Sequence, residues 1–336
     1  MKTYDDSVRL KKLAFDLDVS YKKEKLSNEQ ILKRRWRNTE KALRQALPLI
    51  RRVYRQLADE VLSLLKEIDF SYDRINSKVP ERVKRIVNDR MDAWKKRGLA
   101  KGYLLYMMAT HKWTYESVLK LLLTGLYAEK YRELDEISND VFVIAAVDVY
   151  AQSVADRGAP DPIPLSMAAI MALALMPVLQ NTYVEYLDAT MISQVEEMES
   201  FVLVNYMQSI EITDKEIIIR ALKQAKRILN IDNDKYSGGL DDAARATGNA
   251  AYTENTEDEP DLQVRFIAEM DEKTTPMCRS LDGQVFNVHK QNTFTRYSAM
   301  AGNEIEVSCR GLVAGLNMPP ISDHFHWCRS TLTYQI

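Results

Sequence analysis

The sequence predicts a mainly α-helical protein, in which a long helical N-terminal region precedes a small α+β C-terminal domain. Apolar residues recur at three- and four-residue spacing through most of the chain as far as residue 239, which is typical of amphipathic helices. From Gln263 apolar and polar residues begin to alternate, and an Asp-Gly pair at residues 282–283 is typical of a hairpin turn. All three cysteines and three of the four histidines lie in the last sixty residues. We therefore expect a charged arm over residues 1–26, a helical scaffold over 27–239 and a separate domain over 240–336.

Charged residues are unevenly distributed along the 336-residue chain, although the net charge is only −2. Residues 1–132 carry 31 basic and 17 acidic side chains, whereas residues 133–336 carry 15 basic and 31 acidic ones. A basic half joined to an acidic half indicates either a polyanionic partner on the basic side or docking of the two halves on each other. Both interpretations are open at this point.

A long basic helix is predicted directly after the arm. Ser27 and Gln30 form a capping box, in which each side chain accepts the backbone N–H of the other residue. Pro48 lies inside this helix and is expected to kink or split it, because its ring clashes with the preceding turn and it has no N–H to donate. The basic residues of the helix form a predicted basic stripe that consists of Lys33, Arg34, Arg35, Arg37, Lys41, Arg44, Arg51, Arg52 and Arg55.

The basic stripe is a candidate DNA-binding surface. Lysine and arginine side chains along one helix can neutralise several phosphates of double-stranded DNA without reading its sequence. A stripe of this kind also suits an acidic protein partner or a solvated helix face. Non-specific binding to double-stranded DNA is the interpretation that we follow, and the other two stay as alternatives.

Further helices are predicted along the scaffold. Pro80 is placed to start a second basic helix and Gly98 to end it. The pattern stays helical over residues 99–134, and Ser138 or Asn139 is expected to cap the next helix. The remaining helices are expected over residues 140–157, 165–188, 190–209, 214–230 and 240–252.

The sequence predicts no membrane segment. The longest apolar run, Leu165–Leu179, is shorter than the roughly 18–20 residues that a bilayer-spanning helix needs. The first residues contain no apolar segment of the kind found in secretory signals, so the chain is expected to fold in the cytoplasm. Three cysteines also do not form the disulfide framework of a small secreted protein.

The C-terminal domain is expected to contain strands. Residues 263–270 alternate in their first half, and residues 281–286 hold the Asp-Gly hairpin signal between apolar residues. Residues 305–309 are a further candidate strand. We therefore expect a hairpin around Gly283 within a small mixed domain.

A cysteine and histidine cluster in this domain is a candidate zinc site. Its predicted ligands are Cys278, His324, His326 and Cys328. On a helix His324 and Cys328 would share a face, and on a strand His326 and Cys328 would, so two ligands can converge in either case. Zinc prefers such nitrogen and sulfur ligands in closed structural sites. The alternatives are that the two cysteines are buried as small apolar residues or form a disulfide.

No enzyme activity is predicted. The sequence contains no H-E-x-x-H, G-x-S-x-G, Walker A or G-x-G-x-x-G motif. The Cys/His cluster could still hold a metal that activates water, so a metal-dependent hydrolase or toxin-like effector is the alternative function. A third possibility is a helical adaptor whose charged halves only dock on each other.

The C-terminal motifs resemble the minor capsid, or head-morphogenesis, family of tailed phages that is named after the F protein of phage Mu. The resemblance covers about residues 240–336 and rests on three segments of the chain. The first is the helix over residues 243–252, and the second is the segment from Asp271 to Phe286, which contains Cys-Arg-x-Leu-Asp-Gly-x-x-Phe. The third runs from Pro319 to Thr331 and ends in His-x-His-x-Cys-Arg-Ser-Thr. Many relatives carry a further cysteine at the position that Thr275 occupies here.

The resemblance implies a protein inside the phage head that is present in few copies and assembles in the host cytoplasm. Members of this family associate with the portal and other head proteins, and some contact DNA or leave with it on ejection. The basic stripe would then face packaged DNA, which is consistent with the interpretation made from charge alone.

Overall fold

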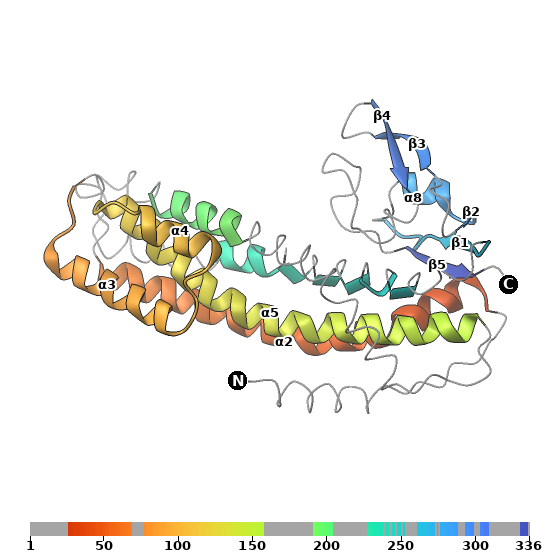
Figure 1. Cartoon of the computed structure of the whole chain (residues 1–336), viewed down its shortest axis with the longest axis horizontal. Coiled ribbons are helices and arrows are strands. Elements are labelled where there is room, and N and C mark those ends of the chain that lie inside the picture. The colour runs from red at the N-terminus through yellow and green to blue at the C-terminus, as the bar shows by residue number, and fades with distance from the viewer. Residues whose placement is uncertain are drawn as a thin grey trace. The chain divides into compact units, whose positions relative to one another are not determined.

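The structure is a computed structural model, and its elements are labelled in Figure 1. It describes residues 26–68, 77–157 and 191–203 and, with short gaps, residues 227–252, 261–287, 293–298, 303–308 and 330–334. The described chain is mainly helical with a few strands near the C-terminus, as the sequence predicted.

The chain forms two compact units, and each of them is discontinuous in sequence. Unit 1 contains Met1–Ala46, Ser138–Thr182 and Gly238–Ile336, and unit 2 contains Leu47–Ile137 and Tyr183–Ser237. The domain boundaries predicted at residues 26/27 and 239/240 stay predictions, because a compact unit of the structure need not coincide with a domain that is defined by sequence pattern.

Helix α2 (Asn28–Glu67) begins with the predicted capping box. The backbone N–H of Ser27 donates to Gln30 Oε1 at 2.9 Å, and the N–H of Gln30 donates to Ser27 Oγ at 3.3 Å. Pro48 lies inside the helix without splitting it, so of the two predicted effects the split is wrong and the kink stays a prediction. A proline removes one backbone hydrogen bond, and the apolar residues on both sides of Pro48, such as Ile50 at 0% exposure, continue the buried face.

Helix α3 (Glu81–Lys96) confirms both predicted ends. Pro80 is its N-cap, and Gly98, whose φ is +70°, directly follows the C-cap residue Arg97. The N–H of Gly98 donates to the carbonyl of Lys95 at 3.0 Å, and the N–H of Leu99 donates to that of Trp94 at 2.9 Å. This pair of bonds is the Schellman motif, and Leu99 and Trp94 are both buried, as that motif commonly requires.

Helices α4 (Gly102–Thr110) and α5 (Tyr115–Asp156) replace the helices predicted over residues 99–134 and 140–157. Residues 111–114 separate α4 from α5, and the predicted cap at Ser138 is wrong because α5 continues through it. Ser138 is fully buried within unit 1. Every residue from 141 to 150 is buried as well, so packing along the whole helix overrides the local cap signal.

Unit 2 contains the C-terminal part of α2, helices α3 and α4, the N-terminal part of α5, and helical residues 191–203 and 227–234. Lys130 Nζ of α5 lies 2.9 Å from Glu60 of α2. The hydroxyls of Tyr54 and Tyr131 both donate to Gln194 Oε1, at 3.3 and 2.7 Å. Burial raises the pKa of both tyrosines well above the ordinary range, so they stay neutral donors.

Unit 1 contains a three-stranded antiparallel sheet in the order β2–β1–β5 (Figure 1). Strand β1 (Gln263–Ile267) is central, with β2 (Val285–Asn287) and β5 (Thr331–Tyr334) on its two sides. Val264 lies opposite both Phe286 and Tyr334, and Phe266 lies opposite Leu332. These five side chains are buried in one core cluster with Cys278 and Leu281.

Helix α8 (Pro276–Leu281) lies between β1 and β2, so the predicted hairpin over residues 281–286 is wrong. Gly283 has a φ of +78° in the turn from α8 into β2, so the Asp-Gly pair is indeed a tight turn. Strands β3 (Thr293–Ser298) and β4 (Asn303–Ser308) form a separate antiparallel pair. Strand β4 contains most of the strand predicted over residues 305–309.

Several predicted elements lie outside the described residues. These are nearly all of the arm over residues 1–26, the helix over 165–188 with the run Leu165–Leu179, and most of the helix over 214–230. Among the helices that the structure describes, none combines the length and the apolarity that crossing a bilayer requires.

Candidate functional site

The segment Asp271–Phe286 of the C-terminal motif forms a connector between strands β1 and β2. The N–H of Asp271 donates to Thr274 Oγ1 at 2.8 Å, and the N–H of Thr274 donates to the carbonyl of Asp271 at 3.2 Å. Arg279 holds this turn from the following helix, because its Nη2 donates to the carbonyl of Asp271 at 2.9 Å and its Nε to that of Thr274 at 3.1 Å. These three motif residues therefore have structural roles.

The Leu-Asp-Gly part of the motif closes the connector onto β1. Asp282 Oδ1 accepts the backbone N–H of Ala268 at 2.9 Å, immediately after β1 ends. The N–H of Gly283 donates to the carbonyl of Phe266 at 2.9 Å, and the N–H of Phe266 donates to the carbonyl of Gln284 at the same distance. Leu281 is 0% exposed beneath this turn. This part of the motif therefore fixes the turn after which the chain pairs with β1 as strand β2.

Cys278 of the candidate zinc site is buried at 3% exposure. It packs in the same core cluster as Leu281, Phe286 and Phe266. The other three predicted ligands, His324, His326 and Cys328, lie outside the described residues. Among the residues that the structure describes, no group of three metal-ligating side chains is found. The apolar surroundings of Cys278 suit a packed thiol, and zinc stays a prediction through which we derive no function.

Helical residues 247–249 and 251–252 contact the residues at and after the end of the third motif segment. Asn249 Nδ2 donates to the carbonyl of Ser330 at 2.6 Å, and Thr331 Oγ1 donates to Asn249 Oδ1 at 2.7 Å. The rings of Tyr252 and Tyr334 are stacked with centroids 4.6 Å apart. Residues from the first and third motif segments thus meet, and Leu332 and Tyr334 share the core cluster with Cys278 and Leu281 of the second.

A buried ionic network in unit 1 joins α2 and α5 to β5. Arg35 is 0% exposed, and its Nη2 donates to the carbonyl of Leu332 at 3.1 Å and lies 3.5 Å from Asp156 Oδ2. Arg34 is hydrogen-bonded to the other oxygen of Asp156. The hydroxyl of Tyr252 donates to Asp156 Oδ2 at 2.8 Å, and the guanidinium of Arg35 stacks 3.7 Å from the centre of that tyrosine ring.

A second layer of polar contacts lies on the N-terminal side of Asp156 in α5. Asn38 Nδ2 donates to Asp148 Oδ1 at 2.9 Å, and Gln152 Nε2 donates to Asp148 Oδ2 at 3.0 Å. Ser153 Oγ donates to the carbonyl of Tyr252 at 2.7 Å. Burial raises the pKa of Tyr252 above the ordinary range, although the positive charge of Arg35 acts to lower it. The Tyr252 hydroxyl therefore remains protonated and donates to Asp156.

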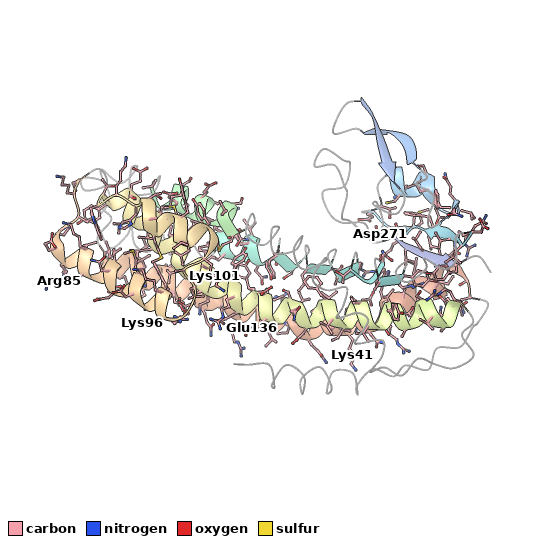
Figure 2. All side chains as sticks on the ribbon, in the orientation of Figure 1. Lys41, Arg85, Lys96, Lys101, Glu136 and Asp271 are labelled. Atoms are coloured by element: carbon pink, nitrogen blue, oxygen red, sulfur yellow. The ribbon has the colours of Figure 1, made fainter. Side chains whose placement is uncertain are left out.

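The structure corrects the composition of the predicted basic stripe. Arg35 is buried and Arg34 is mostly buried against Asp156, so neither lies on an exposed surface. Lys33, Arg37, Lys41 and Arg44 are exposed on the part of α2 in unit 1, and Lys41 points away from the ribbon in Figure 2. Arg51, Arg52 and Arg55 are exposed on the part in unit 2.

The exposed members of the stripe differ in their partners. Lys33 lies 2.7 Å from Glu29, and Arg44 lies 3.6 Å from Glu40. Arg37 and Lys41 have no carboxylate partner among the described residues. Residues 33, 37, 41 and 44 follow one another at four- and three-residue steps, so they lie along one face of α2.

The buried network was missed from the sequence, although a signal for it exists. Asp148, Gln152 and Asp156 recur every four residues within an otherwise apolar stretch of α5. A polar row on one face of a buried helix needs hydrogen-bonding partners, and Arg35 faces away from Lys33 and Arg37 on a helix of 3.6 residues per turn. Both patterns together predict a buried pairing between these helices.

Comparisons with known proteins identify no relative, since no protein-family model, no curated protein and no solved structure matches this chain.

Proposed function

We propose that this protein is a minor capsid protein of a tailed phage, located inside the phage head and associated with the portal. It belongs, in this proposal, to the head-morphogenesis proteins that resemble the F protein of phage Mu. It contacts packaged DNA without sequence specificity and contributes to assembly or to DNA ejection. It carries out no reaction of its own.

The observation that supports the proposal most directly is the contact between described residues of the three motif segments. Residues of the helix over 243–252, of the segment 271–286 and of the segment up to Thr331 pack or hydrogen-bond with one another. Six described motif residues have structural roles. Asp271, Thr274 and Arg279 form the turn, Cys278 and Leu281 fill the core, and Asp282 anchors the chain to the end of β1. Such a motif marks a fold, as expected for a structural protein.

The exposed face of α2 supports the DNA-binding part of the proposal. Lys33, Arg37, Lys41 and Arg44 lie along one face, and the two without carboxylate partners among the described residues are the central ones. Charges in such a row can follow a phosphate backbone and release its counterions. This surface reads no bases, because lysine and arginine contacts to phosphate carry no sequence information.

Association with the portal is tested by co-expression of the full chain with the portal protein of the same phage. We expect the two to elute together from a size-exclusion column, and we expect peptides of this chain in the mass spectrum of purified virions. A matched sample in which the portal is replaced by the major capsid protein serves as the control. Separate elution from the portal together with absence from virions would remove the assignment.

Binding to DNA is expected to weaken with salt in proportion to the phosphates neutralised. A slope of about −0.9 in log K against log salt per phosphate predicts a total of about −3 to −4 for the four exposed residues of α2 in unit 1. The double substitution Arg37→Gln and Lys41→Gln is expected to reduce the slope by about 2. Fluorescence anisotropy with a labelled duplex at several salt concentrations measures both values.

The control for this experiment is Gln45→Ala, since Gln45 is exposed on the same helix and carries no charge. It should leave both the affinity and the slope unchanged. A flat salt response of the unmodified protein would contradict DNA binding through this face.

A further inference from the structure

Helix α4 of unit 2 (Figure 1) is apolar on two opposite faces, but only one of them is buried. None of its nine residues carries a charge. Leu104, Met107 and Met108 are buried on one face. On the other face Leu105 is 52% exposed and Tyr106 is 59% exposed. A helix that is apolar all round is normally covered on every side, so the exposed face of α4 indicates a surface that a partner covers.

Four exposed residues of α4 form a single stripe, the α4 stripe, which consists of Gly102, Leu105, Tyr106 and Ala109. They are spaced i, i+3, i+4 and i+7, so they lie along one side of the helix. The ring of Tyr106 is stacked on that of Tyr103, with the ring centroids 6.1 Å apart. The stripe is therefore large and apolar in its middle and small at both ends, which suits the approach of a second helix.

Helix α3 of the same unit has a solvated face of the ordinary kind. Its exposed positions carry Glu81, Arg82, Arg85, Asn88, Asp89, Asp92, Ala93, Lys95 and Lys96. Only the alanine among them is apolar. Aromatic residues are enriched and charged residues are depleted at the centre of protein–protein interfaces. The α4 stripe has the composition of an interface centre, and the exposed face of α3 does not.

A lysine lies at each end of the α4 stripe. Lys101 precedes the first residue of α4 and is labelled in Figure 2, and Lys112 follows the C-cap residue His111. Both lysines are exposed, and neither has a carboxylate partner among the residues that the structure describes. Their charges are therefore available to carboxylates of a partner that lies along the stripe.

We propose that the α4 stripe binds one amphipathic helix of a partner protein, and that the apolar face of this helix has an acidic residue near each end. The apolar face of the partner helix covers Leu105 and Tyr106. Its two carboxylates lie beside Lys101 and Lys112. The inference does not depend on the proposed function.

Three other occupants fit the surface less well. A second copy of this chain that docks through the same face about a two-fold axis would place lysine beside lysine, whether the two α4 helices run parallel or antiparallel. The phosphates of a nucleic acid would leave Leu105 and Tyr106 uncovered. A helix that lies in a membrane surface uses a wide apolar face, whereas Leu104, Met107 and Met108 of α4 are already buried in unit 2.

The test uses the full-length protein and three fluorescently labelled helical peptides of equal length, each kept helical by a lactam bridge on its outer face. The first has leucines at i, i+3, i+4 and i+7 and a glutamate one turn beyond each end of this row. The second has lysines in place of the glutamates, and the third has serines in place of the leucines. We expect both to bind at least about tenfold more weakly than the first, as measured by fluorescence anisotropy. Equal binding of either peptide would overturn the proposal.

A single substitution locates the binding without touching a buried residue. Leu105→Ser is expected to weaken the binding of the first peptide by roughly fivefold, because it removes apolar surface from the middle of the stripe. Ile231→Ser is the matched control, since Ile231 is also apolar and 42% exposed in unit 2 but lies outside α4. An equal effect of the two variants would reject the site.

A charge exchange tests the selection of acidic ends. The double substitution Lys101→Glu and Lys112→Glu is expected to reverse the preference, so that the peptide with lysine ends binds more tightly than the peptide with glutamate ends. An unchanged preference would show that these two lysines do not contact the ends of the partner and would overturn the proposal.

Two further measurements test the other occupants of the stripe. Sedimentation equilibrium of the full-length protein detects a dimer, and co-sedimentation with vesicles of phosphatidylglycerol and phosphatidylcholine detects membrane binding. We expect neither measurement to show an association that depends on Leu105. A dimer or a vesicle complex that Leu105→Ser abolishes would assign the stripe to that occupant and would overturn the proposal.

Discussion

Replacing Arg35 with alanine is expected to destabilise unit 1 by about 3–5 kcal/mol, the cost of removing one partner from a buried ion pair. Arg35 is fully buried and contacts Asp156, the carbonyl of Leu332 and the ring of Tyr252. Its loss leaves the carbonyl of Leu332 without this donor and opens a cavity between α2 and β5. The remaining pairing of Asp156 with Arg34 and Tyr252 places the expected value toward the lower end.

The measurement is hydrogen exchange by mass spectrometry under native conditions, because it reports peptides of unit 1 and unit 2 separately. Arg37→Ala is the control on the same helix, since Arg37 is exposed, and it should change stability by less than about 0.5 kcal/mol. A loss for Arg35→Ala as small as that of Arg37→Ala would show that the buried network contributes little to unit 1. The variant Arg35→Met separates the effect of the cavity from the effect of the lost ion pair, because methionine fills most of the volume of Arg35 without pairing with Asp156.

The substitution Gly125→Ala is expected to destabilise unit 2 by about 2–4 kcal/mol, through overpacking of a tight helix contact. A Cβ at Gly125 would lie 2.5 Å from Trp94 Cε2 and still closer to Cζ2 and Cη2 of the same ring. Real Cβ atoms do not approach a ring so closely, and the buried Trp94 has little room to move. The better helix propensity of alanine offsets only about 1 kcal/mol of this cost.

A double-mutant cycle identifies the clash as the cause. In a Trp94→Phe background the space beside Gly125 is larger, so Gly125→Ala should become close to neutral or stabilising. Gly98→Ala is a useful comparison, because nothing lies within 4 Å of a Cβ there and only its φ of +70° opposes the change. It should cost about 1–2 kcal/mol, from backbone strain alone. Unfolding in urea followed by circular dichroism gives these differences, and a cost of Gly125→Ala that stays the same in the Trp94→Phe background would contradict the packing argument.

The parts of the fold that sequence predicted correctly depend on neighbouring residues. The Ser27–Gln30 capping box, the end of α3 at Gly98 and the positive φ of Gly283 each follow from the chemistry of a few consecutive residues. Serine is a common capping residue, but Ser138 is fully buried in the middle of α5, where burial decides the conformation. Local signals therefore predicted these helix ends and turns correctly, and they failed where distant residues pack against the same segment.

The candidate site was only partly predictable for the same reason. The motif over residues 271–286 indicated which residues matter, and the exposed basic face followed from charge counts. Charge counts also placed Arg34 and Arg35 on that face, but the structure pairs both with Asp156. Asp156 lies more than a hundred residues further along the chain, so the local sequence did not reveal this pairing. A pocket in unit 1 is lined by residues of α2, by Arg245 and by residues that follow β1, and no pattern within one segment predicts such a meeting.

The contact between Arg35 and β5 has a consequence for the order of folding. It joins residues 297 positions apart in the chain, so forming it requires closure of a very large loop. The contact of Trp94 with Gly125, in contrast, closes a short one within unit 2. Contacts between residues near in sequence form faster than contacts between distant residues, so the helices of unit 2 should form early. The pairing of β5 with β1 should then limit the rate at which unit 1 folds. Until that step a newly made chain exposes the edge of β1, which makes this interval its period of greatest risk for aggregation.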